Sequence, residues 1–182
     1  MSSTTDVALD VFRVLETGDP ALALETAGPG FHNRAAVVAP AACAKPGPAG
    51  LLASSAWMRY AFPDLHFEIV DTAEQDGRVF VRLRMQGTHT APFVQYEDGE
   101  LAQIVPPTGR PVDFEQIHVL VVENGRAIEH DAVRDDLTML GQLGVFPPTP
   151  AFGVASLQWK ISGRAKRAAA HITAAAETAS RV

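Results

Sequence analysis

The chain has 182 residues, of which 47% are hydrophobic, and its mean hydropathy is +0.05, so it can bury one sizeable core without a stapling disulfide or metal. The net charge is −6 and no basic run precedes residue 160, which argues against a nucleic-acid-binding surface. Cys43 is the only cysteine, which excludes an internal disulfide and a cysteine-based zinc site and favours a reducing compartment. The first residues lack the basic and apolar regions of a secretion signal and no segment is apolar enough to span a bilayer, so we expect a cytoplasmic protein.

The first third of the chain predicts three helices. Apolar residues recur at helical spacing after a cap at Thr4, Thr5 or Asp6, and this helix ends at Gly18. Asp19-Pro20 begins a short second helix that the Gly28-Pro29-Gly30 break must terminate. A loop rich in Ala, Pro and Gly then leads to a third helix over about 48–62, which Pro63 stops.

The middle of the chain predicts an antiparallel meander. Its four strand-like runs alternate apolar and polar side chains or are rich in β-branched residues, and they cover 65–72, 78–90, 112–122 and 126–133. The insertion 94–111 contains Asp98-Gly99 and a Pro-Pro-Thr-Gly turn, which favours a projecting loop or hairpin able to cover a pocket.

The C-terminal part predicts further helices. Asp135 or Asp136 caps a short helix ending near Gly144, and a Pro-rich link at 147–150 leads to a long helix interrupted only by Gly163. An apolar stripe along that helix, rich in Ala, favours packing on protein over a membrane surface, either against the reverse face of the sheet or against a second copy. We therefore divide the chain into a domain over 1–146 and a link with C-terminal helix over 147–182.

The hairpin formed by 118–131 is the most informative segment. Asn124-Gly125 signals a two-residue type I′ turn, and counting back from a Glu123–Arg126 pair sets His118 opposite Asp131 on one face. That face is unusually polar, whereas the reverse face is apolar and contains Ile117, Val119, Val121, Ile128 and Ala132. A His beside a carboxylate can exchange protons near neutral pH, so His118 and Asp131 form a candidate catalytic pair.

Two other interpretations of this hairpin remain open. An exposed His–Asp pair on a solvated sheet face would contribute only about 0.2–1 kcal/mol and have no role in chemistry. A bulge at Gly125 would slip the register by one residue, set His118 against His130 and turn Asp131 away.

Five local strings, in order, resemble the SnoaL-like polyketide cyclase (ester cyclase) family of the nuclear transport factor 2-like superfamily. The resemblance covers roughly residues 7–150, and the strings are Ala61-Phe62-Pro63-Asp64-Leu65, Gly87-Thr88-His89-Thr90, Pro107-Thr108-Gly109-Arg110-Pro111-Val112, Arg134-Asp135-Asp136-Leu137 and Gln142-Leu143-Gly144. The family implies an α+β cone, a cystatin-like arrangement of N-terminal helices on a bent antiparallel sheet, here with a C-terminal helical extension.

The resemblance implies a pocket between the sheet and the helices and no metal or organic cofactor. It also implies a cyclase or isomerase that closes a ring by an intramolecular aldol reaction on a polyketide-like carbonyl substrate, an activity of the lyase or isomerase class. Asp131 matches the family's acid/base and His118 its partner, although the Glu-His-Trp of many relatives reads Glu129-His130-Asp131 in this chain.

Eight further residues are candidates for substrate binding. Some have equally plausible structural roles, since His89 can merely hold a loop, helical aromatics are more often core, and Arg134 with Asp135 can form a structural ion pair. The candidate set is His32, Asn33, Trp57, Phe62, His89, Phe114, Gln116 and Glu129.

The alternatives to a cyclase are a non-catalytic small-molecule-binding or dimerising module and an epoxide hydrolase-like enzyme on the same fold. The six histidines lack metal-ligand spacing, and no phosphate loop or nucleophile elbow is present. The apolar reverse face and the family favour a homodimer whose only other partner is its small-molecule substrate.

Overall fold

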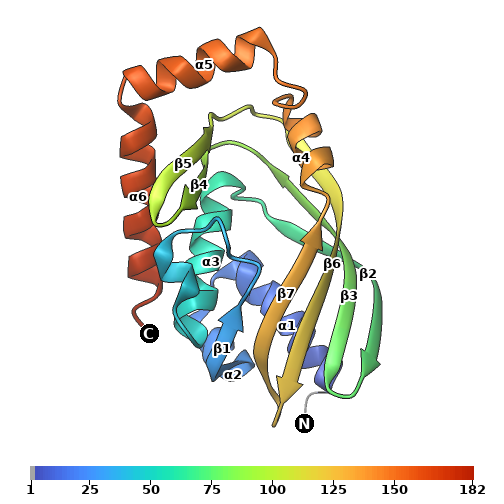
Figure 1. Cartoon of the computed structure of the whole chain (residues 1–182). Coiled ribbons are helices and arrows are strands. Elements are labelled where there is room, and N and C mark those ends of the chain that lie inside the picture. Colours follow the sequence, from blue (N-terminus) through green and yellow to red (C-terminus); the bar gives the residue numbers. More distant parts are fainter. Residues whose placement is uncertain (1–2) are drawn as a thin grey trace.

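A five-stranded sheet curves around the N-terminal helices, as Figure 1 shows for the computed structural model, which describes residues 3–182. The strand order is β1-β7-β6-β3-β2, and the last four form the predicted antiparallel meander. Their bounds are β2 His66–Gln75, β3 Arg78–Thr88, β6 Pro111–Glu123 and β7 Arg126–Arg134. The chain therefore has the α+β cone of nuclear transport factor 2-like proteins.

Three helices cover the concave face, and their ends follow the capping signals of the sequence. Helix α1 (Thr4–Thr17) begins with a capping box between Ser3 and Asp6, just before the predicted cap, and ends at Gly18 in the left-handed conformation. Asp19 caps α2 (Pro20–Thr26), and α3 spans Pro48–Ala61 after a short 3-10 turn, η1 (Ala41–Ala44). All three predicted helices are confirmed.

The segment predicted as a helix-terminating break is instead an edge strand, β1 (Ala27–Asn33). It pairs in parallel with β7, and its register is irregular between Ala27 and His32. Pro29 lacks a backbone donor, which an edge strand tolerates because one side of it has no partner strand. This strand brings Asn33 beside β7 and so helps to form the site described below.

The predicted projecting insertion is a separate hairpin of β4 (Phe93–Glu97) and β5 (Glu100–Val105). It lies between α3 and the C-terminal helix (Figure 1). The Tyr96 hydroxyl bonds to the backbone oxygen of Ala169 at 3.0 Å and lies 3.0 Å from the Thr173 hydroxyl. The hairpin is thus attached by these contacts to the C-terminal helix.

The long helix predicted after the Pro-rich link is two helices, α5 (Pro150–Ile161) and α6 (Arg164–Ala179), which change direction at Gly163 (Figure 1). Gly163 has a φ of 70°, a left-handed conformation that an α-helix cannot continue through. The small-residue face of α6 packs on α3 and not on the reverse face of the sheet, and its buried residues are Ala165, Ala168, Ala169, Ile172 and Ala176. Helix α4 (Asp136–Leu143) precedes them.

Within residues 3–182 no helix is long and apolar enough to cross a membrane.

Replacement of Ile172 by Ala tests whether α6 belongs to the core. The Ile172 side chain is fully buried, so we expect Ile172→Ala to lower the free energy of unfolding by about 2–5 kcal/mol. The matched control is Ile161→Ala on α5, where the side chain is 78% exposed and the change should stay within about 0.5 kcal/mol. Urea denaturation measures the free energy of unfolding of both variants. An effect of Ile172→Ala as small as that of Ile161→Ala would show that α6 does not stabilise the fold.

Candidate functional site

The hairpin between β6 and β7 contains the predicted turn and also a bulge, which the alternative interpretation of the sequence places at a different residue. Asn124 and Gly125 have φ values of 50° and 73°, and Glu123 pairs with Arg126, as a type I′ turn requires. Val122 pairs with Ala127, but Val121 pairs with Glu129, so Ile128 has no partner on β6. The extra residue is a β-bulge, and it lies at Ile128 and not at Gly125.

This bulge contradicts the predicted pairing of His118 with Asp131. His118 lies opposite Ala132, and Asp131 lies opposite Val119 on the outer face, where its side chain is exposed. One inserted residue moves every later side chain of β7 to the other face of the sheet, because side chains alternate along a strand. The carboxylate is therefore separated from His118 by the sheet, and His130 faces inward in its place.

His118, His130 and Gln116 form a buried hydrogen-bonded relay on the inner face. Nδ1 of His118 lies 2.7 Å from Nε2 of His130, and the two ring planes are within 10° of each other. Nε2 of His118 lies 2.7 Å from Oε1 of Gln116. Phe12 of α1 packs its ring edge-on against both imidazoles, which excludes water from one side of the relay.

The bonding pattern determines which nitrogen atoms carry protons. The Gln116 amide donates from Nε2 to Sδ of Met85, so its oxygen accepts a hydrogen bond from the Nε2–H group of His118. Nδ1 of His118 then accepts from the Nε2–H group of His130. The remaining nitrogen, Nδ1 of His130, is buried and has no hydrogen-bond partner among the described residues. The relay ends in an unprotonated, unpartnered imidazole nitrogen, which is a potential base.

Burial keeps both imidazoles neutral. The pKa of His130 is lowered from 6.5 to about 4, mainly by burial and further by the positive charge of Arg134, while Asp131 acts in the opposite direction. The pKa of His118 is lowered well below 6.5 by burial, by His130 and by Arg134. Both histidines are therefore neutral at neutral pH, and within the described part of the chain Nδ1 of His130 is the one ring nitrogen of the pair with a free lone pair.

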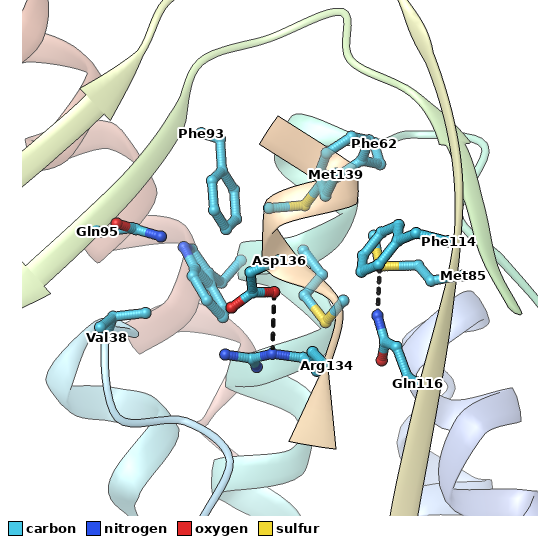
Figure 2. Close-up of a pocket in the computed structure, with 12 residues that line it drawn as sticks. Val38, Phe62, Met85, Phe93, Gln95, Phe114, Gln116, Arg134, Asp136 and Met139 are labelled. Carbon is cyan, nitrogen blue, oxygen red and sulfur yellow. Dashed lines mark hydrogen bonds and ion pairs between the residues drawn. The ribbon is translucent and has the colours of Figure 1, made fainter. Parts of the chain in front are cut away.

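Two adjoining compartments lie between the sheet and the helices. The larger has a volume of about 450 Å³ including its mouth, and Figure 2 shows its apolar walls from Phe62, Phe93, Phe114, Met85 and Met139. The inner compartment, about 390 Å³ when the open space at its edge is counted in the same way, is lined by His118, His130, Asn33 and Ser54 among others. They share Trp57, Met58 and Arg134, so the relay adjoins a cavity with flat aromatic walls.

The predicted substrate-binding residues divide into three groups. Trp57, Phe62, Phe114 and Gln116 line the larger compartment and Asn33 the inner one. His32 and Glu129 lie outside both compartments, because His32 is exposed and Glu129 is on the outer face of β7 in an ion pair with Arg34. The prediction that these two line the pocket is wrong.

His89 is buried beside the site without lining either compartment. Its ring packs on Phe62, its Nδ1 lies 3.1 Å from the Thr108 hydroxyl, and its backbone bonds to Gly109 and Arg110. These contacts match the structural role considered for it, because they hold the segment that follows β5. Burial lowers its pKa from 6.5 to about 4.

Sequence reasoning missed several lining residues. Arg134 pairs with Asp136 at 3.4 Å and not with Asp135, which caps α4 instead. Once the bulge is known, the alternation along β7 places His130, Ala132 and Arg134 on the inner face, but no residue in the hairpin signals that bulge. The other missed residues include Val38, Met58, Met85, Phe93, Gln95 and Met139 of the larger compartment and Leu15, Ala35, Ala36, Ser54 and Phe67 of the inner one. No group of three or more potential metal ligands occurs within residues 3–182.

The sequence profile of the SnoaL-like polyketide cyclase family matches residues 5–143, and this chain belongs to that family. The chain is 31% identical over 105 residues to the aklanonic acid methyl ester cyclase DnrD of Streptomyces peucetius and equally identical to DauD of Streptomyces sp. strain C5. These matches cover 57% of this chain and only 66% and 60% of those proteins.

Solved structures support the same fold. Wild-type IdmH of Streptomyces antibioticus is 26% identical, with a TM-score of 0.60 over 79% of this chain and 100% of its own. TsrD of Streptomyces laurentii has the same TM-score at 20% identity, over 78% of this chain and 95% of its own. The matched family region ends before α5 and α6.

The buried histidines predict a loss of stability in acid. Because the pKa of His89 is about 4 in the folded chain and near 6.5 when unfolded, the unfolded chain binds this proton first as the pH falls. This contribution is complete above about pH 6.5 and is lost as the pH falls toward 4. His89→Asn can keep a bond to Thr108 but cannot titrate there, so its melting temperature should fall less than that of the wild type between about pH 7 and 5. His171→Asn, at an exposed site on α6, serves as the control and should behave as the wild type does.

Proposed function

We propose that this chain is a cofactor-independent cyclase that closes a ring in a polycyclic polyketide ester by an intramolecular aldol reaction. The observation that carries the proposal is the unpartnered Nδ1 of His130 at the end of a neutral, buried relay that adjoins an aromatic-walled cavity. An unsatisfied buried nitrogen costs about 1–3 kcal/mol, so its presence calls for an explanation, and a catalytic role is one. The curated relatives DnrD and DauD act on aklanonic acid methyl ester, as their names state, which supports this substrate class.

In this mechanism His130 is the acid/base in place of Asp131. Nδ1 of His130 removes a proton from a carbon flanked by carbonyl groups, and the electron pair of that C–H bond forms an enolate. The hydrogen bond between Nε2–H of His130 and His118 stabilises the resulting imidazolium, because His118 accepts it with a lone pair. The enolate carbon then bonds to the acceptor carbonyl carbon, and the imidazolium returns the proton to the new alkoxide oxygen. The net reaction is an isomerisation that consumes no cofactor.

The cavity walls support a flat substrate. Trp57 and Phe93 stack on each other with ring centroids 5.3 Å apart and an interplanar angle of 27°, and both line the larger compartment. Planar fused rings pack favourably on such surfaces. His118 positions the base, and Trp57, Phe62, Phe114, Gln116 and Asn33 bind the rings and their oxygen atoms.

The decisive variant is His130→Gln. Glutamine can donate to His118 as Nε2 of His130 does, but it has no basic nitrogen, so we expect turnover of aklanonic acid methyl ester to fall about 10²–10⁴-fold. Binding, followed by tryptophan fluorescence in a Trp159→Phe background that leaves Trp57, should change little. The control is His171→Gln on the exposed face of α6. Unchanged turnover in His130→Gln would exclude this base, and ligand binding without turnover in the wild type would favour a binding module.

We also propose a homodimer through the outer face of the sheet. Exposed apolar side chains gather there, including Ile117 at 51% and Val133 at 77% exposure. Arg78 borders the same groove as Glu129 and Asp131, and a twofold axis would bring the Arg of one chain to the acids of the other. Light scattering should give twice the 19.4 kDa chain mass, and Ile117→Lys should yield monomers. A wild-type monomer would contradict this arrangement.

A further inference from the structure

Arg134 is the only Lys or Arg among the residues that line either compartment, and it lines both of them. The bulge places it on the inner face of β7, directly opposite Gln116 of the relay. The contacts of its guanidinium group show which of its hydrogen-bond donors remain free.

The guanidinium group of Arg134 is only partly occupied by protein acceptors. Nη1 donates to the backbone oxygen of Ala35 at 3.2 Å, and Nε lies 3.4 Å from a carboxylate oxygen of Asp136. Figure 2 shows this ion pair as a dashed line, with Gln116 on the neighbouring strand β6. Within residues 3–182 Nη2 makes no hydrogen bond, and the side chain is 29% exposed. These two anchors fix the orientation of the guanidinium plane while Nη2 remains available.

From this geometry we infer that Arg134 forms an anion subsite, which binds a negatively charged oxygen on a planar, polyketide-like ring system. The inference rests on the proposed function for the choice of ring system, but the subsite itself requires no turnover. A guanidinium group suits this task because it stays charged and presents its donors in a fixed plane. In the proposed reaction the oxygen would be that of the enolate, which gains negative charge as His130 takes the proton.

The electrostatic environment of the relay agrees with this assignment. The charge of Arg134 contributes to the low pKa of both His118 and His130, so it is close enough to influence charges at the relay. A cation that disfavours imidazolium stabilises an anion in the same place. Asp136 offsets part of the positive charge of Arg134. It does so only at Nε of Arg134, and the Asp136 side chain is 48% exposed and therefore in contact with solvent.

Two matched probes test the subsite without chemistry. Anthraquinone-2-carboxylate and its methyl ester share the ring system but differ in charge at neutral pH. We expect the wild type to bind the carboxylate about tenfold more tightly than the ester at low salt, as measured by quenching of tryptophan fluorescence in a Trp159→Phe background, where Trp57 is the remaining tryptophan. Arg134→Gln should remove this preference while leaving the affinity for the ester unchanged, and Arg134→Lys should keep part of it.

Asp136→Asn provides an independent arm, because removal of the competing carboxylate should increase the preference for the anionic probe. This arm still tests the inference if Arg134→Gln does not fold. Equal affinities for the two probes in the wild type, or an undiminished preference in Arg134→Gln, would overturn the inference. His130→Gln should keep the preference for the carboxylate probe, because Arg134 is unchanged. If this variant kept both the preference and normal turnover, His130 would be refuted as the base, while the anion subsite would stand.

Discussion

The bulge at Ile128 is the constraint on which the rest of the site depends. It lies three residues after the Asn-Gly turn, and it reverses the faces of all later residues of β7 relative to a regular hairpin. His130, Ala132 and Arg134 turn inward, whereas Glu129, Asp131 and Val133 turn outward. A regular hairpin would have placed a carboxylate beside His118 and left Arg134 in solvent. One unpaired residue thus decides whether the interior is acidic or basic.

The consequence is an interior that favours negative charge on a bound molecule. Two neutral imidazoles are buried here with three of their four ring nitrogens hydrogen-bonded, through the bond between the two rings and the bond to Gln116, and only Nδ1 of His130 has no partner among the described residues. Burial and the nearby guanidinium group both oppose protonation of the pair. A neutral base next to a fixed cation would suit the proposed enolate formation, since the base would gain a proton while the oxygen near the cation gained negative charge.

Much of the fold follows from local sequence signals, but the site does not. Ser3, Asp19 and Gly18 mark helix ends because capping is a local interaction, and Asn124-Gly125 fixes its turn for the same reason. The bulge has no such signal, because Ile128 is β-branched and fits a regular strand as well as an irregular one. The edge strand that contains Pro29 could not be predicted either, because Gly and Pro favour a break in local structure. It forms a strand because it pairs with β7, which is distant in the sequence. Residues whose position depends on long-range register could therefore not be predicted.

The wall of the cavity depends on residues outside the matched family region. A two-stranded hairpin is marginally stable alone, yet β4 contributes Phe93 and Gln95 to the cavity. The Tyr96 hydroxyl ties this hairpin to α6, and Lys45 bonds to Glu177 and Ser180 near the end of the same helix. Since α6 also packs along α3, which carries Trp57 and Met58, it fixes two cavity walls relative to each other. The C-terminal extension thus shapes the space that the substrate must fit, although none of its residues lines the cavity.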